Sequence, residues 1–191
     1  MDISSQTRHF IAIGLIVFAG LFVFSDVLGH DFLLNWDDEW YVIRNEWVRG
    51  LTVDHLKNSF TRVYLWNYAP VNLISYMIDY EVDGLNPAVF HGTNLLLHIL
   101  KACMVYLVVH AVHARFLAAL GAGLLFLVHP AQVESVAWIA ERKNVLSFFF
   151  FAWSFLEYLR HRRGGRAVSY GLSLTLFVLA LLSKSAAAIL P

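Results

Sequence analysis

The stretch FHGTNLLLHILKACMVYLVVHAV, residues 90–112, contains a single charged side chain of the Asp, Glu, Lys or Arg type, Lys101. An apolar run of about 20 residues is the length that an α-helix needs to cross a bilayer. The whole chain of 191 residues is 59% hydrophobic and 15% charged, whereas soluble domains are about 45–50% apolar and about 25% charged. These residues therefore predict a helical membrane protein.

Further apolar runs lie on both sides of this stretch. We expect an all-α, polytopic membrane protein with about five spans plus the start of a sixth, in which residues 1–191 belong to one membrane domain. The first run is read as an uncleaved anchor, because residues 25–29 offer no small-x-small cleavage site. Small residues within 117–128 predict a tightly packed helix. The runs cover residues 10–24, 116–128, 145–159 and 168–182, and a last one opens at residue 186.

The turn RHRRGGR, residues 160–166, holds four arginines and no acidic residue. Short loops rich in Lys and Arg face the cytoplasm, so this turn and, by alternation, the N-terminus are expected inside. Residues 30–89, residues 129–144 and the chain from residue 183 are then expected outside. Residues 31–89 carry nine acidic and four basic side chains, a net charge of −5. We therefore expect the chemistry on the outer face.

Composition excludes other classes of protein. The formal net charge is zero, which argues against a nucleic-acid partner. Cys103 is the single cysteine, so a disulfide scaffold is excluded. The chain has no Gly-rich phosphate loop, no GxSxG and no CxxC, and an enzyme of this kind would take a membrane-borne substrate.

An acidic run, WDDEWY at residues 36–41, opens the first outer segment. Three adjacent carboxylates repel one another, so at least one is hard to ionise without a partner. A general base would exploit this crowding, and so would a divalent cation bound by Asp37, Asp38 and Glu39. An acidic, solvated loop is the plainer alternative, and the residues leave all three readings open.

A polar stripe lies on the helix expected at residues 90–112. His91, Asn94, His98 and Lys101 follow one another at spacings of 3, 4 and 3, which places them on one helical face. Polar groups inside a span face protein or a water-filled cavity. Hydrogen bonds between helices explain Asn94 and His98 equally well, whereas Lys101 calls for a carboxylate, a phosphate or an aqueous cavity.

The second outer segment, residues 129–144, contains His129, Glu134 and the adjacent cations Arg142 and Lys143. The spacing of His129 and Glu134 does not match a zinc protease motif. Two cations at an outer interface can clamp a lipid-linked phosphate. They can equally extend toward headgroups without binding a specific ligand.

The order of these motifs resembles the membrane part of the transmembrane and tetratricopeptide-repeat O-mannosyltransferases and their bacterial relatives. These are type C glycosyltransferases, which use polyprenyl-phosphate donors. The resemblance extends over roughly residues 10–191 and depends on order and spacing more than on any single motif. The segments that carry it are WDDEWYV (36–42), YAPV (68–71), GLNP (84–87), FHGTN (90–94), His98, residues 129–143 and LLSK (181–184).

The resemblance implies transfer of a sugar, mannose in the eukaryotic branch, from a lipid phosphate to a protein hydroxyl. Asp37 or Asp38 would be the general base, and a direct displacement would invert the anomeric centre. The implied partners are membrane lipids, the lipid-linked donor and a protein acceptor; a divalent cation near the acidic run occurs in parts of the superfamily. The implied substrate-binding residues are His91, His129 and Glu134 in the cavity, and Arg142, Lys143 and Lys184 at the donor phosphate.

Two departures from the pattern qualify this expectation. Ala69 stands where relatives often have a basic residue, and the chain stops at Pro191, where relatives continue with more spans and usually a repeat domain. A truncated gene, a fragment or a split subunit is therefore expected. A non-catalytic scaffold or lipid-phosphate-binding fragment is the alternative function; a transporter subunit is disfavoured by the apolar residues 103–109. The outer segments lack Asn-x-Ser/Thr sequons, which favours a bacterial inner membrane over the endoplasmic reticulum.

Overall fold

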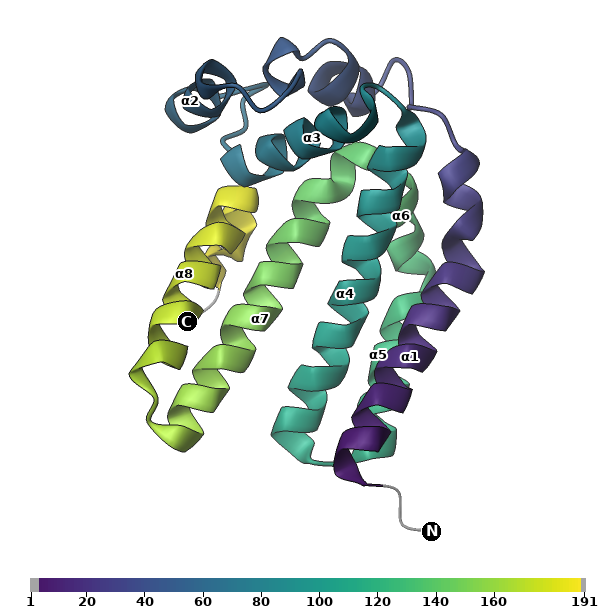
Figure 1. Ribbon diagram of the computed structural model, residues 1–191, viewed down its shortest axis with the longest axis vertical. Helices are drawn as coiled ribbons and strands as arrows, with labels where there is room; N and C mark the ends of the chain where they lie inside the picture. The colour runs from purple at the N-terminus through teal and green to yellow at the C-terminus, as the bar shows by residue number, and fades with distance from the viewer. Residues whose placement is uncertain (1–3, 190–191) are drawn as a thin grey trace.

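The computed structural model describes residues 4–189, and every regular element in this range is helical (Figure 1). The expectation of an all-α fold is confirmed. The longer helices lie side by side and form a bundle along the long axis of the molecule. They are α1 (Ser5–Phe24), α4 (Pro87–His113), α5 (Phe116–Val128), α7 (Arg142–Gly164) and α8 (Ala167–Ser183).

A cap of shorter elements lies at one end of the bundle, and we define it as residues 30–86 and 129–141; its helix α6 (Val133–Ala137) runs down beside α4 (Figure 1). The longest helix of the cap, α3 (Pro70–Asp83), runs across the top of the bundle. The cap elements are η2 (Glu39–Ile43), η3 (Glu46–Val48), α2 (Val53–Thr61), α3 (Pro70–Asp83), η4 (Pro130–Gln132), α6 (Val133–Ala137) and η5 (Ile139–Glu141); η1 (Ser25–Gly29) and η6 (Ser185–Ile189) extend α1 and α8.

The opposite end of the bundle, which we call the basic end, contains the start of α1 and the turns that follow α4 and α7. Local sequence signals stop both of these helices. Ala114 ends α4 in the left-handed conformation with φ 54, after His110 and His113 in the last turn. Gly165 ends α7 with φ 65, the conformation that glycine adopts without a steric penalty. The two segments expected on one side of the membrane thus share the cap, and the arginine-rich turn lies at the other end.

The contact between α4 and α5 depends on small residues, as the sequence predicted. Ala119 is fully buried. A Cβ at Gly123 would lie 3.1 Å from both Ile16 Cδ1 and Tyr106 Cβ and 3.2 Å from the Ala102 carbonyl oxygen, whereas a Cβ at Gly121 would meet nothing within 4 Å. Gly123 therefore permits close helix packing, and Gly121 faces away from it.

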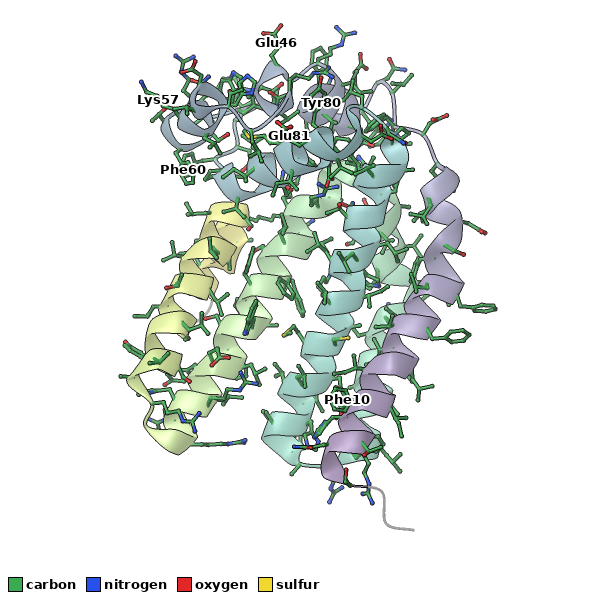
Figure 2. All side chains as sticks on the ribbon, in the orientation of Figure 1. Phe10, Glu46, Lys57, Phe60, Tyr80 and Glu81 are labelled. Atoms are coloured by element: carbon green, nitrogen blue, oxygen red, sulfur yellow. The ribbon has the colours of Figure 1, made fainter. Side chains whose placement is uncertain are left out.

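The outside of the bundle is apolar. Phe22 of α1, Leu117 of α5 and Val168 of α8 are 77%, 78% and 83% exposed. Large exposed apolar side chains on several helices are typical of a surface that contacts lipid or another protein. Figure 2 shows Phe10 on α1, while the labelled charged residues Glu46, Lys57 and Glu81 lie on the cap. The charged and apolar surfaces are therefore separated along the long axis.

Fewer helices qualify as membrane spans than the sequence led us to expect. Within residues 4–189, two helices are long and apolar enough, Gln6–Gly29 and Pro87–His113; a third is added if Phe116–Val128 and Pro130–Ala137, bent by 56°, form one broken span. This corrects the expectation of about five spans. The remaining helix α8 has 17 residues, and α7 carries charged residues at both ends and in its interior. The expected start of a sixth span coincides with η6, and residues 190–191 lie outside the described residues.

Candidate functional site

The acidic run separates into three different environments in the cap. Asp38 is fully buried, and its carboxylate accepts hydrogen bonds from the backbone N–H groups of Leu33 (3.1 Å) and Ala140 (2.8 Å). Burial raises the pKa of Asp38, and the two backbone donors oppose that shift. Asp38 therefore joins the first outer segment to the second, and no face of its carboxylate is open to a substrate.

Asp37 points the other way. Its side chain is 46% exposed, and its Oδ2 lies 3.8 Å from Lys143 Nζ. Asp37 lines a hollow of about 410 Å³ together with Trp40, Tyr41 and Leu65, which we call the Asp37 hollow. Lys143 Nζ also lies 5.1 Å from the centre of the Tyr41 ring, which favours a cation. A carboxylate and an ammonium group thus meet at the edge of a surface hollow.

Glu39 is turned toward its own segment. Its carboxylate accepts from the backbone N–H of Asn35 (2.8 Å) and pairs with Arg44 (2.6 Å), and these contacts, the Asn35 hydrogen bond first, lower the pKa of Glu39. The three carboxylates point apart and do not form a metal site. Elsewhere within residues 4–189 there is also no group of three or more His, Cys, Asp or Glu side chains that could hold a metal ion. The divalent cation considered for Asp37, Asp38 and Glu39 stays a prediction without an assembled ligand set.

A buried network surrounds Arg142, the first residue of α7. Its Nη1 lies 2.5 Å from Asp79 Oδ2 on α3, and both side chains are almost completely buried. Its Nε donates to Asn94 Oδ1 (2.7 Å) and its Nη2 donates to the Phe90 carbonyl (2.7 Å), both on α4. The guanidinium also lies 4.6 Å from the centre of the Tyr76 ring. One side chain thus holds α3, α4 and α7 together beneath the cap.

The two adjacent cations therefore have different surroundings. Arg142 was expected to hold a donor phosphate, but its donors are engaged by buried protein groups, and a phosphate would have to displace Asp79. Lys143, 15% exposed, reaches the surface beside Asp37. Lys184, which follows α8, donates a hydrogen bond to Asn144 Oδ1 on α7. Lys143 and Lys184 thus meet the same end of α7, and Arg142 supports that end from inside.

A second hollow lies on the other side of the acidic run. It has a volume of about 710 Å³, and the Trp36 and Trp138 rings meet edge to face in it, with centroids 5.7 Å apart. Glu134 lines this hollow and does not line the one at Asp37. The full lining is His30, Asp31, Phe32, Leu33, Trp36, Glu134, Ala137 and Trp138.

The two histidines expected at the substrate lie outside the Asp37 hollow. His129 is exposed at the α5–η4 bend, where its Nδ1 accepts from the backbone N–H of Ala131 (3.2 Å) and caps the turn. His91 is buried in α4, and its ring meets that of His30 edge to face at 5.9 Å. The structure thus brings Asp37 and Lys143 together. It places Glu134 in the lining of the second hollow and His91 against His30 of that lining, whereas His129 lines neither hollow.

The polar stripe of α4 makes contacts between helices, which confirms that reading for Asn94 and His98. Asn94 Nδ2 donates to the Trp138 carbonyl (3.1 Å), and His98 Nε2 lies 2.9 Å from the Leu127 carbonyl oxygen. Lys101 Nζ donates to Gln132 Oε1 (3.1 Å) and lies 5.3 Å from the centres of two phenylalanine rings. An amide and two aromatic faces take the place of the expected carboxylate, phosphate or cavity.

Asp79 is the buried carboxylate that sequence reasoning missed. It lies on the buried face of α3 with Asn72 and Tyr76, at helical spacings of four and three residues. Burial raises its pKa, while Arg142 opposes the shift. A lone acid on the apolar face of a helix was the available signal, because such a group needs a buried cation.

The chain is similar to protein O-mannosyl-transferases. It is 31% identical over 121 residues to protein O-mannosyl-transferase Tmtc1 of Drosophila melanogaster, and the matched region covers 63% of this chain and 14% of the relative. It is 32% identical over 123 residues to TMTC1 of Mus musculus, which covers 63% and 12%. It is 31% identical over 150 residues to tmtc2 of Xenopus laevis, which covers 74% and 18%.

The chain spans less than a fifth of the length of these curated relatives. No family model matches it. No solved structure matches it either. The three relatives come from animals, and the expectation of a bacterial inner membrane stays a prediction.

Proposed function

We propose that this chain carries the acceptor-activating part of a membrane glycosyltransferase that moves a sugar, mannose by analogy with the names of its relatives, from a polyprenyl-phosphate donor to a protein Ser or Thr hydroxyl. The observation that carries the proposal is the pairing of Asp37 with Lys143 at a surface hollow. The similarity to proteins named O-mannosyl-transferases supplies the reaction.

Asp37 is the general base in this proposal. Its carboxylate is exposed enough to reach an acceptor hydroxyl, whereas that of Asp38 is buried and engaged by two backbone donors. The acceptor oxygen forms a bond to the anomeric carbon while the bond from that carbon to the phosphate oxygen breaks, and the hydroxyl proton passes to Asp37. Asp38 fixes the loop that presents Asp37.

The leaving phosphate is held by lysines. Lys143 lies beside Asp37, and Lys184 contacts Asn144, the neighbour of Lys143 on α7. Their charges stabilise the phosphate as negative charge develops on it. Arg142 contributes from inside the protein, because its ion pair with Asp79 fixes the first turn of α7 and therefore the position of Lys143.

The bundle lies in the membrane with the cap on the outer or lumenal face and the N-terminus in the cytoplasm. The arginine-rich turn at residues 160–166 supports this orientation. Helix α7 packs against both α4 and α8, and α8 exposes apolar side chains such as Val168 and Val178, which supports a position of this pair beside the spanning helix α4. The hollow beside Asp37 then opens where a lipid phosphate and an extracytoplasmic protein can meet.

The test is sugar transfer by the complete reading frame, expressed in membranes and supplied with labelled mannosyl polyprenyl phosphate and a Ser/Thr-rich protein acceptor. Asp37→Asn keeps the shape of the side chain and removes its basicity. Loss of a general base lowers the rate by about 10²–10⁴-fold, so transfer by Asp37→Asn is expected to fall by at least about 100-fold, with kcat affected more than KM.

The matched control is Glu46→Gln, which removes an exposed carboxylate elsewhere on the cap (Figure 2). It is expected to leave transfer unchanged. Near-normal transfer by Asp37→Asn would exclude Asp37 as the base. If wild-type membranes transfer no sugar from any polyprenyl-phosphate donor, the chain belongs to the alternative class, a non-catalytic scaffold or lipid-phosphate-binding protein.

A further inference from the structure

A pocket of about 310 Å³ lies at the basic end of the bundle, on the far side of the molecule from the cap. Three helices that are distant in sequence form it. Helix α1 contributes His9, α4 contributes His110, and α7 contributes Arg160 and Arg163; the apolar part of the lining is Leu107, Ala111, Leu156 and Leu159. The fold therefore gathers two imidazoles and two guanidinium groups around one hollow with an aliphatic wall.

The imidazoles are held by aromatic contacts at the back of this pocket. His9 Nδ1 lies 2.5 Å from the Tyr106 hydroxyl, and the His9 and His110 rings meet edge to face with centroids 4.6 Å apart. The His110 ring also stacks on that of Tyr106. Its Nδ1 is buried without a hydrogen-bond partner among residues 4–189. These contacts fix the orientation of both imidazoles in the lining of the pocket.

The charge around the pocket is positive. Arg160 pairs with the buried carboxylate of Glu157, which neutralises one charge. Arg163 donates to the Ala111 carbonyl, a neutral acceptor, so its charge is not compensated there. A guanidinium group presents several N–H donors in one plane and matches the oxygens of a phosphate. Among the pocket-lining residues there is no acidic side chain.

We propose that this pocket binds the phosphate of an anionic phospholipid headgroup. Arg163 and Arg160 contact the phosphate oxygens, the imidazoles of His9 and His110 face the headgroup, and the aliphatic wall formed by Leu107, Leu156 and Leu159 contacts the start of the acyl chains. The position favours a lipid over a soluble phosphate, because the pocket lies at the end of α1 and α4, which are both long and apolar enough to span a membrane. Basic pockets between membrane helices on the cytoplasmic side bind such headgroups.

The proposal does not depend on the glycosyltransferase proposal, because its residues are separate from those of the cap. Its test is a direct binding measurement on the full chain in uncharged detergent, with a fluorescent phosphatidylglycerol as the probe and phosphatidylcholine as the neutral comparison. Arg160→Gln/Arg163→Gln is expected to weaken phosphatidylglycerol binding by about tenfold and to leave phosphatidylcholine binding unchanged.

The same turn supplies a matched control. Arg162→Gln/Arg166→Gln removes the same number of charges from residues outside the pocket lining, and its binding is expected to change less than about twofold. Equal losses in the two double variants would overturn the proposal, because they would indicate diffuse attraction of a basic surface. No loss in either would overturn it as well.

Two further arms keep the result decisive. Arg163→Gln alone leaves the Arg160–Glu157 pair intact, so it reports on the pocket if the double variant does not fold, as judged by circular dichroism. It is expected to weaken phosphatidylglycerol binding with unchanged helicity. Displacement of the lipid by millimolar inorganic phosphate would overturn the assignment to a lipid and identify a site for a soluble anion.

Discussion

The cap and the bundle are stabilised by different interactions. In the cap, charged groups are buried and paired, as with Asp38 at the backbone of Ala140 and Arg142 at Asp79. Between α1, α4 and α5, apolar side chains pack closely around small residues such as Ala119 and Gly123. The former contacts are directional, and the latter depend on shape alone.

The difference indicates what each region is built to hold. Directional contacts fix the orientation of individual side chains, which a site such as Asp37 and Lys143 requires. Close packing holds helices together where lipid provides no hydrophobic drive for their association. Substitutions that remove one kind of contact should therefore affect one region and spare the other.

The largest effect is expected at Arg142, which joins α7 to Asp79 of the cap. Arg142→Met leaves Asp79 buried without its cation and removes donors from Asn94 and the Phe90 carbonyl. Removal of one partner from a buried ion pair costs about 3–5 kcal/mol. We expect a loss of this size in the free energy of unfolding, measured by tryptophan fluorescence during titration with a denaturing detergent.

The double variant Arg142→Met/Asp79→Leu sharpens that result. It removes both charges, and replacement of a buried pair by apolar residues is often close to neutral. The double variant is therefore expected to be more stable than Arg142→Met alone. If the two are equally unstable, the ion pair is not what holds α3 to α7.

A smaller effect is expected in the bundle, at Gly123. Gly123→Ala places a methyl group 3.1–3.2 Å from Ile16, Tyr106 and the Ala102 carbonyl, and overpacking of this kind costs about 1–3 kcal/mol. Gly121→Ala, two residues away in the same helix, meets open space and is expected to be neutral or slightly stabilising. The same unfolding titration compares them, and equal stability of the two variants would contradict close packing at Gly123.

The smallest effect is expected in the pH dependence of the free energy of unfolding, to which Asp38 of the cap contributes. Burial raises the folded-state pKa of Asp38 above its ordinary value of 3.8. Between the unfolded and folded pKa values the folded protein binds more protons, so this carboxyl adds stability as the pH falls through its folded pKa. Each unit of difference is worth about 1.4 kcal/mol.

The measurement is the free energy of unfolding at pH values from about 7 down to about 4. Asp38→Asn is expected to gain less stability on acidification than the wild type, whereas Gly123→Ala keeps the wild-type slope. Parallel curves for Asp38→Asn and the wild type would show that Asp38 does not titrate with a raised pKa.

Much of the bundle could be predicted from the sequence. Apolar runs predicted the positions of α1, α4 and α5, and the small residues of α5 predicted its close packing. Both predictions were possible because the length of an apolar run and the volume of its side chains can be read from a short stretch of sequence. The number of spans was overestimated at α7 and α8. They were counted as spans from their apolar runs alone. Helix α7 carries too many charged residues to qualify as a span by composition, and α8, with 17 residues, is too short.

The candidate site was predicted in part. The residues Asp37 and Lys143 were selected from the sequence, and the structure brings them within 3.8 Å of each other. The sequence did not distinguish Arg142 from Lys143, although Arg142 is fully buried and Lys143 is partly exposed beside Asp37. Adjacent residues of a helix point about 100° apart, so one of the two can be buried while the other is exposed. Which one is buried is set by the ion pair of Arg142 with Asp79. Asp79 is more than 60 residues away in the chain, and the sequence did not link it to Arg142.

The hydrogen bond from Ala140 to Asp38 also sets an order of events during synthesis. Its partners are 102 residues apart in the chain, so the first outer segment cannot complete its fold when it emerges. At about 5–20 residues per second, the ribosome needs roughly 5–20 s to reach Ala140 after Asp38. During that interval Asp38 lacks the backbone donor of Ala140, so its carboxylate can be satisfied only by water and by its own segment.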